Sequence, residues 1–135
     1  MPSPRSNDLP RYLTGEEVLY IHYQIIEHVG GSHGVRDMNL FLSTIERPQS
    51  AVFGEEQFST IFEKAAVYLD SFARHQIFVD GNKRTAFTSA ARFLFLNGFE
   101  FEANNEEAEM FVMAVANKKV AFDEIANWLE ERSGQ

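Results

Sequence analysis

The 135-residue sequence contains no cysteine, and this absence removes several classes of chemistry. Without a thiol the protein has no cysteine nucleophile, no thiolate ligand for a metal and no disulfide switch. The sequence also shows neither a signal peptide nor an apolar run long enough to span a membrane. Together these absences lead us to expect a cytoplasmic protein with no membrane partner.

Basic residues are also scarce. The sequence has 12 Lys and Arg against 20 Asp and Glu, which gives a formal net charge of −8. Nucleic-acid backbones are bound through many summed cationic contacts, so we expect no direct binding of nucleic acid. A local group of cations in such an acidic protein would instead suit a small phosphorylated ligand.

Proline is rare, and three of the four prolines fall within residues 1–10. Residues 1–12 are therefore expected to form a flexible N-terminal arm. The remaining residues, 13–135, are expected to fold as a single domain, because a chain of this length buries about two thirds of its unfolded surface. With 44% hydrophobic residues and 13 phenylalanines, a dense aromatic core needs no disulfide or metal.

Apolar residues recur with helical spacing and predict a mainly α helical bundle. The expected helices cover residues 14–30, 37–46, 58–74, 82–96, 106–117 and 122–132. The first should begin at a capping box formed by Thr14 and Glu17 and should be mostly buried. The helix over residues 82–96 is nearly all apolar after its first turn, so we expect it to be the central helix. Residues 47–54 break the helical period and predict a loop or small hairpin.

The segment from His75 to Ala86, which reads HQIFVDGNKRTA, carries most of the functional information. It predicts the end of one helix, a tight loop, and a second helix that begins with two cations. The first turn of a helix leaves backbone N–H groups without partners, and a glycine lets the chain approach a ligand closely. A phosphate is therefore expected here, held by backbone donors with Lys83 and Arg84, while Asp80 binds the accompanying Mg²⁺.

A plain turn followed by a helix cap is the alternative interpretation of this segment. Cations at the start of a helix oppose the helix dipole, however, and such an unfavourable choice indicates a ligand. Phe78 is expected to be a core anchor that fixes the loop. None of the histidines forms a recognisable metal-binding set.

The nine residues from Phe78 to Ala86 resemble the motif of the Fic/Doc family, in the version of the death-on-curing (Doc) toxins of toxin–antitoxin systems. The family motif reads His-Pro-Phe-x-Asp-Gly-Asn, followed by Lys-Arg-Thr-Ala in the Doc branch and by Gly-Arg in adenylyltransferases. The resemblance extends from about Leu13 to Leu129. It implies a Fic-type helical bundle with a short β-hairpin or loop as a flap that aligns the target. Arg47, Pro48 and Gln49 are similar to the start of that flap.

One position departs from the family pattern. The motif histidine stands two residues before the phenylalanine, where this sequence has Gln76. In the family this histidine is the general base that takes the proton of the target hydroxyl. A glutamine hydrogen-bonds a hydroxyl but accepts no proton at neutral pH. The neighbouring His75 is the candidate substitute base, although one step along a helix rotates a side chain by about 100°.

The resemblance implies a Doc-like toxin that transfers phosphate from ATP to a hydroxyl of a translation factor, elongation factor Tu in the family. Asp80 would hold Mg²⁺, Gly81 and Asn82 would form the anion-holding loop, and Lys83 and Arg84 would bind the phosphates. Gln76 would occupy the position of the base, so that catalysis is impaired. The expected partner is an antitoxin with a helical tail that lies in a groove near the site.

Two alternative functions remain open from the sequence. The first is a protein adenylyltransferase, which would attach AMP through the same scaffold. That branch carries a further arginine where this sequence has Phe87, and its glycine is replaced here by Lys83, so both positions favour the Doc branch. The second is a catalytically silent protein that binds nucleotide or antitoxin.

Overall fold

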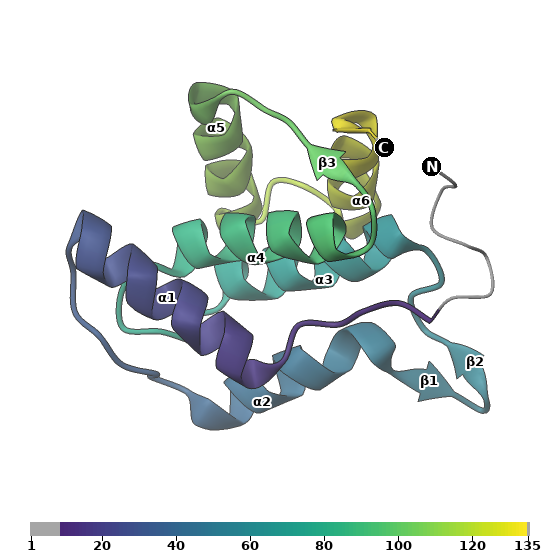
Figure 1. Ribbon diagram of the computed structural model, residues 1–135, viewed down its shortest axis with the longest axis horizontal. Helices are drawn as coiled ribbons and strands as arrows, with labels where there is room; N and C mark the ends of the chain where they lie inside the picture. The colour runs from purple at the N-terminus through teal and green to yellow at the C-terminus, as the bar shows by residue number, and fades with distance from the viewer. Residues whose placement is uncertain (1–8, 135) are drawn as a thin grey trace.

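The computed structural model describes residues 9–134, and within them the fold is mainly α (Figure 1). The helices are α1 (Gly15–Val29), α2 (Met38–Glu46), α3 (Ile61–Arg74), α4 (Asn82–Leu96), α5 (Asn105–Ala116) and α6 (Phe122–Glu131), with a 3₁₀ turn, η1, at Arg47–Gln49. Two small antiparallel pairs join β1 (Ala51–Val52) to β2 (Glu55–Glu56) and β3 (Glu100–Phe101) to β4 (Ser133–Gly134). The expected helical bundle with a short hairpin is confirmed.

Two further expectations concern the ends of the chain and the membrane. Of the expected arm over residues 1–12, residues 1–8 lie outside the described part of the structure, and residues 9–12 belong to no helix or strand. Among the described residues, no helix has both the length and the apolar character needed to cross a bilayer.

Side-chain caps define the beginnings of several helices. Thr14 and Thr60 each form a capping box, with Glu17 and Glu63 respectively, so the box expected at Thr14 is confirmed. Such caps satisfy N–H groups that the first helical turn leaves without partners. The cap at Thr60 also explains why α3 starts later than the expected residue 58.

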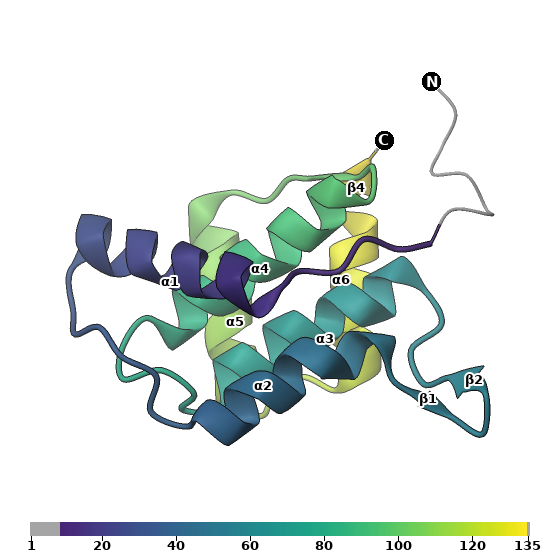
Figure 2. The same cartoon turned by 60° about the horizontal axis from the view of Figure 1, so that its bottom comes forward.

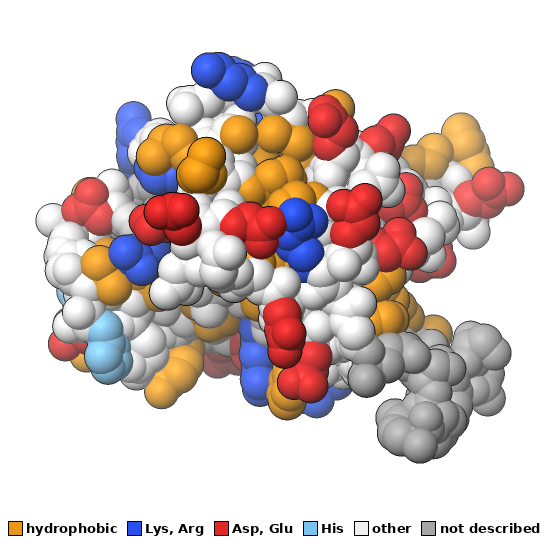
Figure 3. All heavy atoms as spheres, turned by 90° about the horizontal axis from the view of Figure 1, so that it is seen from above, with side chains coloured by type: hydrophobic (Ala, Val, Ile, Leu, Met, Phe, Trp, Pro, Cys, Tyr) orange, Lys and Arg blue, Asp and Glu red, His pale blue; other side chains and the backbone are white. Residues whose placement is uncertain are grey.

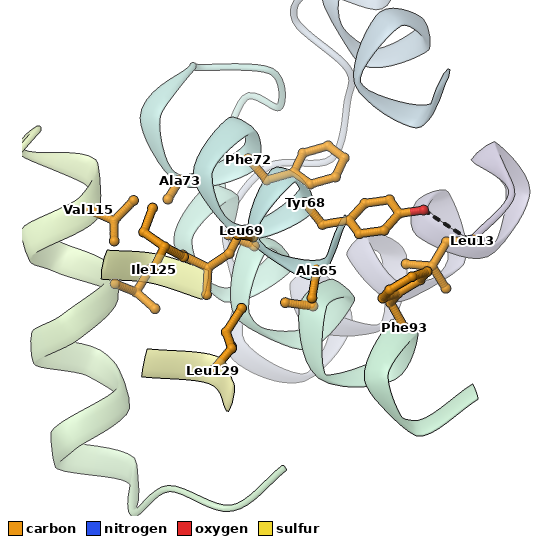
Figure 4. Close-up of a cluster of buried hydrophobic side chains, with 14 of the residues drawn as sticks. Leu13, Ala65, Tyr68, Leu69, Phe72, Ala73, Phe93, Val115, Ile125 and Leu129 are labelled. Carbon is orange, nitrogen blue, oxygen red and sulfur yellow. Dashed lines mark hydrogen bonds between the residues drawn. The ribbon is translucent and has the colours of Figure 1, made fainter. Parts of the chain in front are cut away.

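The core lies around α3, which is the most enclosed helix of the fold. Figure 1 shows α3 behind α4, and Figure 2 shows α2 running beside it. Figure 4 shows α3 side chains meeting those of α4, α5 and α6, and the Tyr68 hydroxyl accepting a hydrogen bond from the Leu13 N–H at 3.1 Å. The expectation that 82–96 is the central helix was therefore wrong, because α3 is more completely buried than α4. Its apolar residues include Phe95, which is 59% exposed, while its small residue Ala90 is buried against the core.

The expectation that the first helix is mostly buried was also wrong. Only Val18, His22 and Ile26 of α1 are buried, spaced four residues apart on one narrow stripe. Tyr20 and Tyr23 are exposed. The helix lies along one edge of the bundle rather than inside it (Figure 1), so one side of its apolar surface faces outward.

The β1–β2 hairpin projects from the end of the molecule where α3 begins (Figures 1 and 2). Its stem is tied to α3 by Lys64, whose side chain is 1% exposed. The Lys64 ammonium donates to the carbonyls of Pro48 and Phe58 and to the Glu56 carboxylate, at 2.8 Å for the last of these. A lysine ammonium has three donors, so all of them are used within the protein.

Candidate phosphate-binding site

The site is built on the loop between α3 and α4, and Phe78 anchors that loop. Phe78 is fully buried and packs against the rings of Phe41 and Phe72, which confirms its expected role as a core anchor. The Asn82 amide closes the loop, because its oxygen accepts from the Phe78 N–H and its nitrogen donates to the Phe78 carbonyl, both at 2.9 Å. The side chain of Asn82 is thus committed to the loop itself, so only its backbone N–H is placed to bind an anion.

The connection between α1 and α2 runs along the loop and is hydrogen-bonded to its backbone. Gly34 accepts a hydrogen bond from the Val79 N–H at 3.1 Å, and the Ile77 carbonyl accepts from the N–H groups of Arg36 and Asp37 at 2.7 and 3.1 Å. These bonds flank a β-bridge between Val35 and Phe78. Residues 77–79 of the loop are therefore hydrogen-bonded to the extended segment 34–37 and do not form an isolated turn.

Asp80 is exposed and lies at the tip of the loop. One carboxylate oxygen accepts a hydrogen bond from the Ser32 N–H at 2.7 Å, which fixes the direction of the side chain. Residues 9–134 contain no group of three or more His, Cys, Asp or Glu side chains able to hold a metal ion. A Mg²⁺ at Asp80 would accordingly take most of its ligands from phosphate oxygens and water, as Mg²⁺ commonly does in nucleotide sites.

His22 is a residue of this site that the sequence analysis did not single out. Its ring is 4% exposed, stacks on Phe78 at 3.9 Å between ring centroids, and lies 2.8 Å through Nε2 from the Asp80 carbonyl oxygen. A carbonyl only accepts, so Nε2 carries the proton and donates it. Burial lowers the pKa of His22, which keeps the ring neutral. No sequence signal separates it from an ordinary core histidine, because its partner is 58 residues away.

Gly81 occupies the position where the loop turns into α4. Its φ of 79° and ψ of 18° fall in the left-handed region that glycine adopts at little cost. A Cβ at this position would lie 3.1 Å from the Ile26 side chain and 3.6 Å from that of His22. The close approach of α1 and the left-handed backbone both explain the glycine.

The beginning of α4 differs from those of α1, α2, α3 and α5, because no side chain caps it. Its first turn also contains no acid. The N–H groups of this turn therefore keep the partial positive charge of the helix end, and the exposed side chains of Lys83 and Arg84 add two full charges. An anion such as a phosphate is the ligand that this combination favours.

Lys83 and Arg84 also line a groove of about 600 Å³ between α1, α4 and α5, called here the α1–α4–α5 groove. Its lining is mostly apolar, with contributions from Ile25, Val29, Lys83, Arg84, Phe87, Thr88, Asn105, Ala108, Glu109, Val112 and Met113. Figure 3, which looks down on the side of α5 and α6, shows hydrophobic side chains gathered among scattered acidic and basic ones.

Gln76 and His75 lie beyond the end of α3, which stops at Arg74. His75 is extended, and its carbonyl accepts a hydrogen bond from the Ile77 N–H at 2.9 Å, so the chain turns tightly at Gln76. The helical rotation of about 100° per residue therefore does not apply at these two positions. Both side chains are exposed. His75 acts on Asp70 of α3, where it helps Arg74 and Arg47 to oppose the rise in the pKa of that carboxyl caused by burial.

The expected flap residues lie at the opposite end of α3 from this loop. Arg47, Pro48 and Gln49 form η1, and the hairpin that follows extends from the N-terminal end of α3, whereas the Asp80 loop follows its C-terminal end (Figures 1 and 2). A helix of 14 residues is about 21 Å long. The structure thus brings Asp80, Gly81, Asn82, Lys83 and Arg84 together but does not place the hairpin over them.

The helical bundle and the Asp80 loop between α3 and α4 are the features expected of a Fic-type protein. The chain belongs to the Fic/DOC family, whose family model matches residues 12–94. That range contains the Asp80 loop, His22 and the hairpin.

Two curated relatives place the chain within the family. It is 39% identical over 99 residues to Toxin Doc of Mycolicibacterium smegmatis, covering 72% of this chain and 76% of that protein. It is 36% identical over 124 residues to Protein kinase doc of Escherichia phage P1, covering 92% of this chain and 97% of that protein. Both relatives are Doc proteins, so the resemblance found in the sequence is confirmed and the chain is Doc-like.

Proposed function

We propose that this chain is a Doc-like toxin that binds Mg²⁺–ATP at the Asp80 loop and directs the γ-phosphate to a protein hydroxyl. The observation that carries the proposal is the uncapped first turn of α4 beside Lys83 and Arg84. The name of the phage P1 relative, Protein kinase doc, supports phosphate transfer rather than AMP transfer. By resemblance the hydroxyl belongs to a translation factor such as elongation factor Tu.

Each residue of the loop has a separate task in this proposal. Asp80 holds Mg²⁺, which supplies charge neutralisation between the phosphates when nucleotide is bound. Gly81 and the first turn of α4 offer backbone N–H donors, and Lys83 and Arg84 neutralise the phosphate oxygens. In the transfer, the target oxygen bonds to phosphorus, ADP leaves, and the hydroxyl proton must go to a base.

Gln76 stands where the family has that base, and an amide accepts no proton at neutral pH. Binding and transfer therefore separate in this chain. Positioning and charge neutralisation supply much of the catalysis of phosphoryl transfer, so nucleotide binding is expected to survive while transfer is slow.

The partner proposed for the α1–α4–α5 groove is the helical tail of an antitoxin. The mostly apolar lining fits the apolar face of an amphipathic helix. Because Lys83 and Arg84 line the groove, a helix bound there would cover these two residues of the phosphate site.

Titration calorimetry with Mg²⁺–ATP tests the proposed site. Arg84→Ala removes one phosphate contact, and we expect about 10- to 100-fold weaker binding, the size of one charge-assisted hydrogen bond. Arg92→Ala, an exposed arginine further along α4, is the matched control and should bind as the parent does. Equal affinity in the parent and in Arg84→Ala would exclude this site.

Mass spectrometry of the modified target separates the competing functions. An added phosphate supports the proposal and an added AMP supports an adenylyltransferase. Nucleotide binding without modification of any protein, also after the base is restored, supports the silent binder.

A further inference from the structure

The Asp80–Gly81 peptide bond can take two orientations, and the sequence of the loop does not choose between them. Gly81 has the angles of the third residue of a type II turn, near φ +80° and ψ 0°. With the peptide turned over, the same residue would have the type I angles, near φ −90° and ψ 0°. Glycine adopts both at little cost, so something outside the loop must select one.

The contact that selects the orientation comes from α1. His22 donates from Nε2 to the Asp80 carbonyl oxygen at 2.8 Å, across 58 residues of sequence. The imidazole itself has little freedom, because it is 4% exposed and stacks on Phe78 with only 10° between the ring planes. A fixed donor therefore holds the carbonyl on the α1 side of the loop.

The direction of the carbonyl also sets the direction of the next N–H. The described chain has no cis peptide bond, and in a trans peptide the C=O and N–H groups point to opposite sides. Since the Asp80 carbonyl points at α1, the Gly81 N–H points away from α1. A flipped peptide would turn that N–H toward the buried face of α1 and present a carbonyl oxygen in its place, which repels an anion.

We propose that His22 is a positioning residue that turns the Asp80–Gly81 peptide so that the Gly81 N–H faces the phosphates of the nucleotide. This inference rests on the proposed function for the identity of the ligand. It assigns to α1 a task in the site, performed by a buried side chain that touches the loop and not the nucleotide. The hydrogen bond from Ser32 to the Asp80 carboxylate holds the same residue from its other side.

Three substitutions separate the hydrogen bond from the packing. His22→Leu fills the space of the ring with an apolar side chain of similar size and removes the donor. His22→Gln places an amide nitrogen the same number of bonds from the backbone as Nε2 and so keeps a donor. His22→Asn carries an amide that is one bond too short to reach the carbonyl, and it replaces the leucine variant if that variant does not fold.

The first measurement is the ¹H–¹⁵N amide signal of Gly81 in the full chain without nucleotide. Both His22→Leu and His22→Gln remove the ring current of the imidazole, so we expect this signal to move in both variants. It should move much further in His22→Leu, where the donor is lost and the peptide is free to turn. The second is calorimetric titration with Mg²⁺–ATP, in which His22→Leu should bind roughly 10-fold more weakly and His22→Gln within about 3-fold of the parent. A merely structural role would alter thermal stability in both variants and would move the Gly81 signal by a similar amount in both.

A Gly81 signal that moves no further in a folded His22→Leu or His22→Asn protein than in His22→Gln would overturn the inference. So would parental affinity for Mg²⁺–ATP in a variant whose Gly81 signal has moved further than that of His22→Gln. If the parent itself binds no nucleotide, the proposed function fails and the role in phosphate binding fails with it. The Gly81 signal of the free protein would then still show whether His22 orients the peptide.

Discussion

At the scale of single residues, the site separates the side chains that bind from the one that would move a proton. Asp80, Lys83 and Arg84 match the Doc motif in type and lie together at the start of α4. Gln76 departs from it and lies in a tight turn outside any helix. In the proposed reaction, proton transfer therefore depends on position 76, whereas the residues for nucleotide binding match the motif.

Restoring the base should restore transfer. We expect Gln76→His to raise modification of the target by on the order of 10²-fold or more, the usual contribution of a positioned general base. The affinity for nucleotide should hardly change, because the phosphate contacts are untouched. Mass spectrometry of the target after a timed reaction gives the rate.

The control for this prediction is His75→Ala in the parent protein. A loss of robust parental activity in that variant would make His75 the working base and would reject the assignment of Gln76. No modification by Gln76→His, together with no growth arrest in cells lacking an antitoxin, would leave the silent binder as the better explanation.

Asp70 makes the stability of the folded protein depend on pH, and the surroundings of its carboxyl set the sign of that dependence. Burial raises the pKa of Asp70 in the folded protein, against the opposing effects of Arg74, Arg47 and His75. The folded state then holds this proton more tightly than the unfolded chain. Its contribution to stability is full below the unfolded pKa of about 3.9 and is lost as the pH rises through the folded pKa.

The variant Asp70→Asn has no such titration. We expect its unfolding free energy, relative to that of the parent, to increase from pH 4 to pH 7. Urea denaturation of both proteins at a series of pH values measures the difference. A difference that stays constant or falls with rising pH would contradict this account.

At the scale of elements, the β1–β2 hairpin depends on its stem. Its strands have two residues each and all of them are exposed, and such a short hairpin is not stable alone in water. Lys64 joins the carbonyls on both sides of the hairpin to α3. The buried ammonium thus helps to hold both ends of the hairpin stem against α3.

Replacing Lys64 with methionine should release the hairpin. The substitution keeps the length of the side chain and leaves two carbonyls without their donor, at a cost of about 1–3 kcal/mol each before relaxation. We expect a lower unfolding free energy by about that amount and faster amide exchange in residues 50–57, with unchanged protection in α3 and α4. Glu56→Gln keeps an acceptor at a half-exposed position, so its loss should stay within about 1 kcal/mol. An equal loss in both variants would mean that the ion pair, rather than the carbonyls, holds the hairpin.

The packing of α4 against α3 gives a second prediction at this scale. Ala90 is 1% exposed and Ala91, its neighbour, is half-buried. Ala90→Leu should lower the unfolding free energy by roughly 1–3 kcal/mol through overpacking, whereas Ala91→Leu should stay within about 0.5 kcal/mol. Thermal unfolding of both proteins compares them. Equal stability would mean that the two faces of α4 are not distinguished by packing.

At the scale of the whole molecule, α1 and the α1–α2 connection bring distant parts of the chain to the Asp80 loop. His22 reaches the Asp80 carbonyl, and Ser32 reaches its carboxylate. Lys83 and Arg84 also line the α1–α4–α5 groove. The phosphate site and the groove proposed for the antitoxin are therefore parts of one surface.

The sequence by itself determined the helical class, the capping box at Thr14 and the loop that leads into the helix beginning at Asn82, because each depends on residues within one or two helical turns of one another. It also showed that Gln76 occupies the position of the motif histidine, because that position is found by counting two residues back from Phe78. The hairpin was predicted only as an alternative to a loop. These features need no knowledge of how the helices pack.

Only the tertiary structure decided which helix is central, which face of α1 is buried and what His22 does. Apolar spacing shows that a helix has a buried side but not how many neighbours cover it, so α4 and α1 were both assigned too much burial. Asn82 was expected to belong to the anion-holding loop, and only the folded structure shows that its side chain bonds to the backbone of Phe78. The hydrogen bond between His22 and Asp80 joins residues 58 apart, and such a contact exists only once the helices have packed.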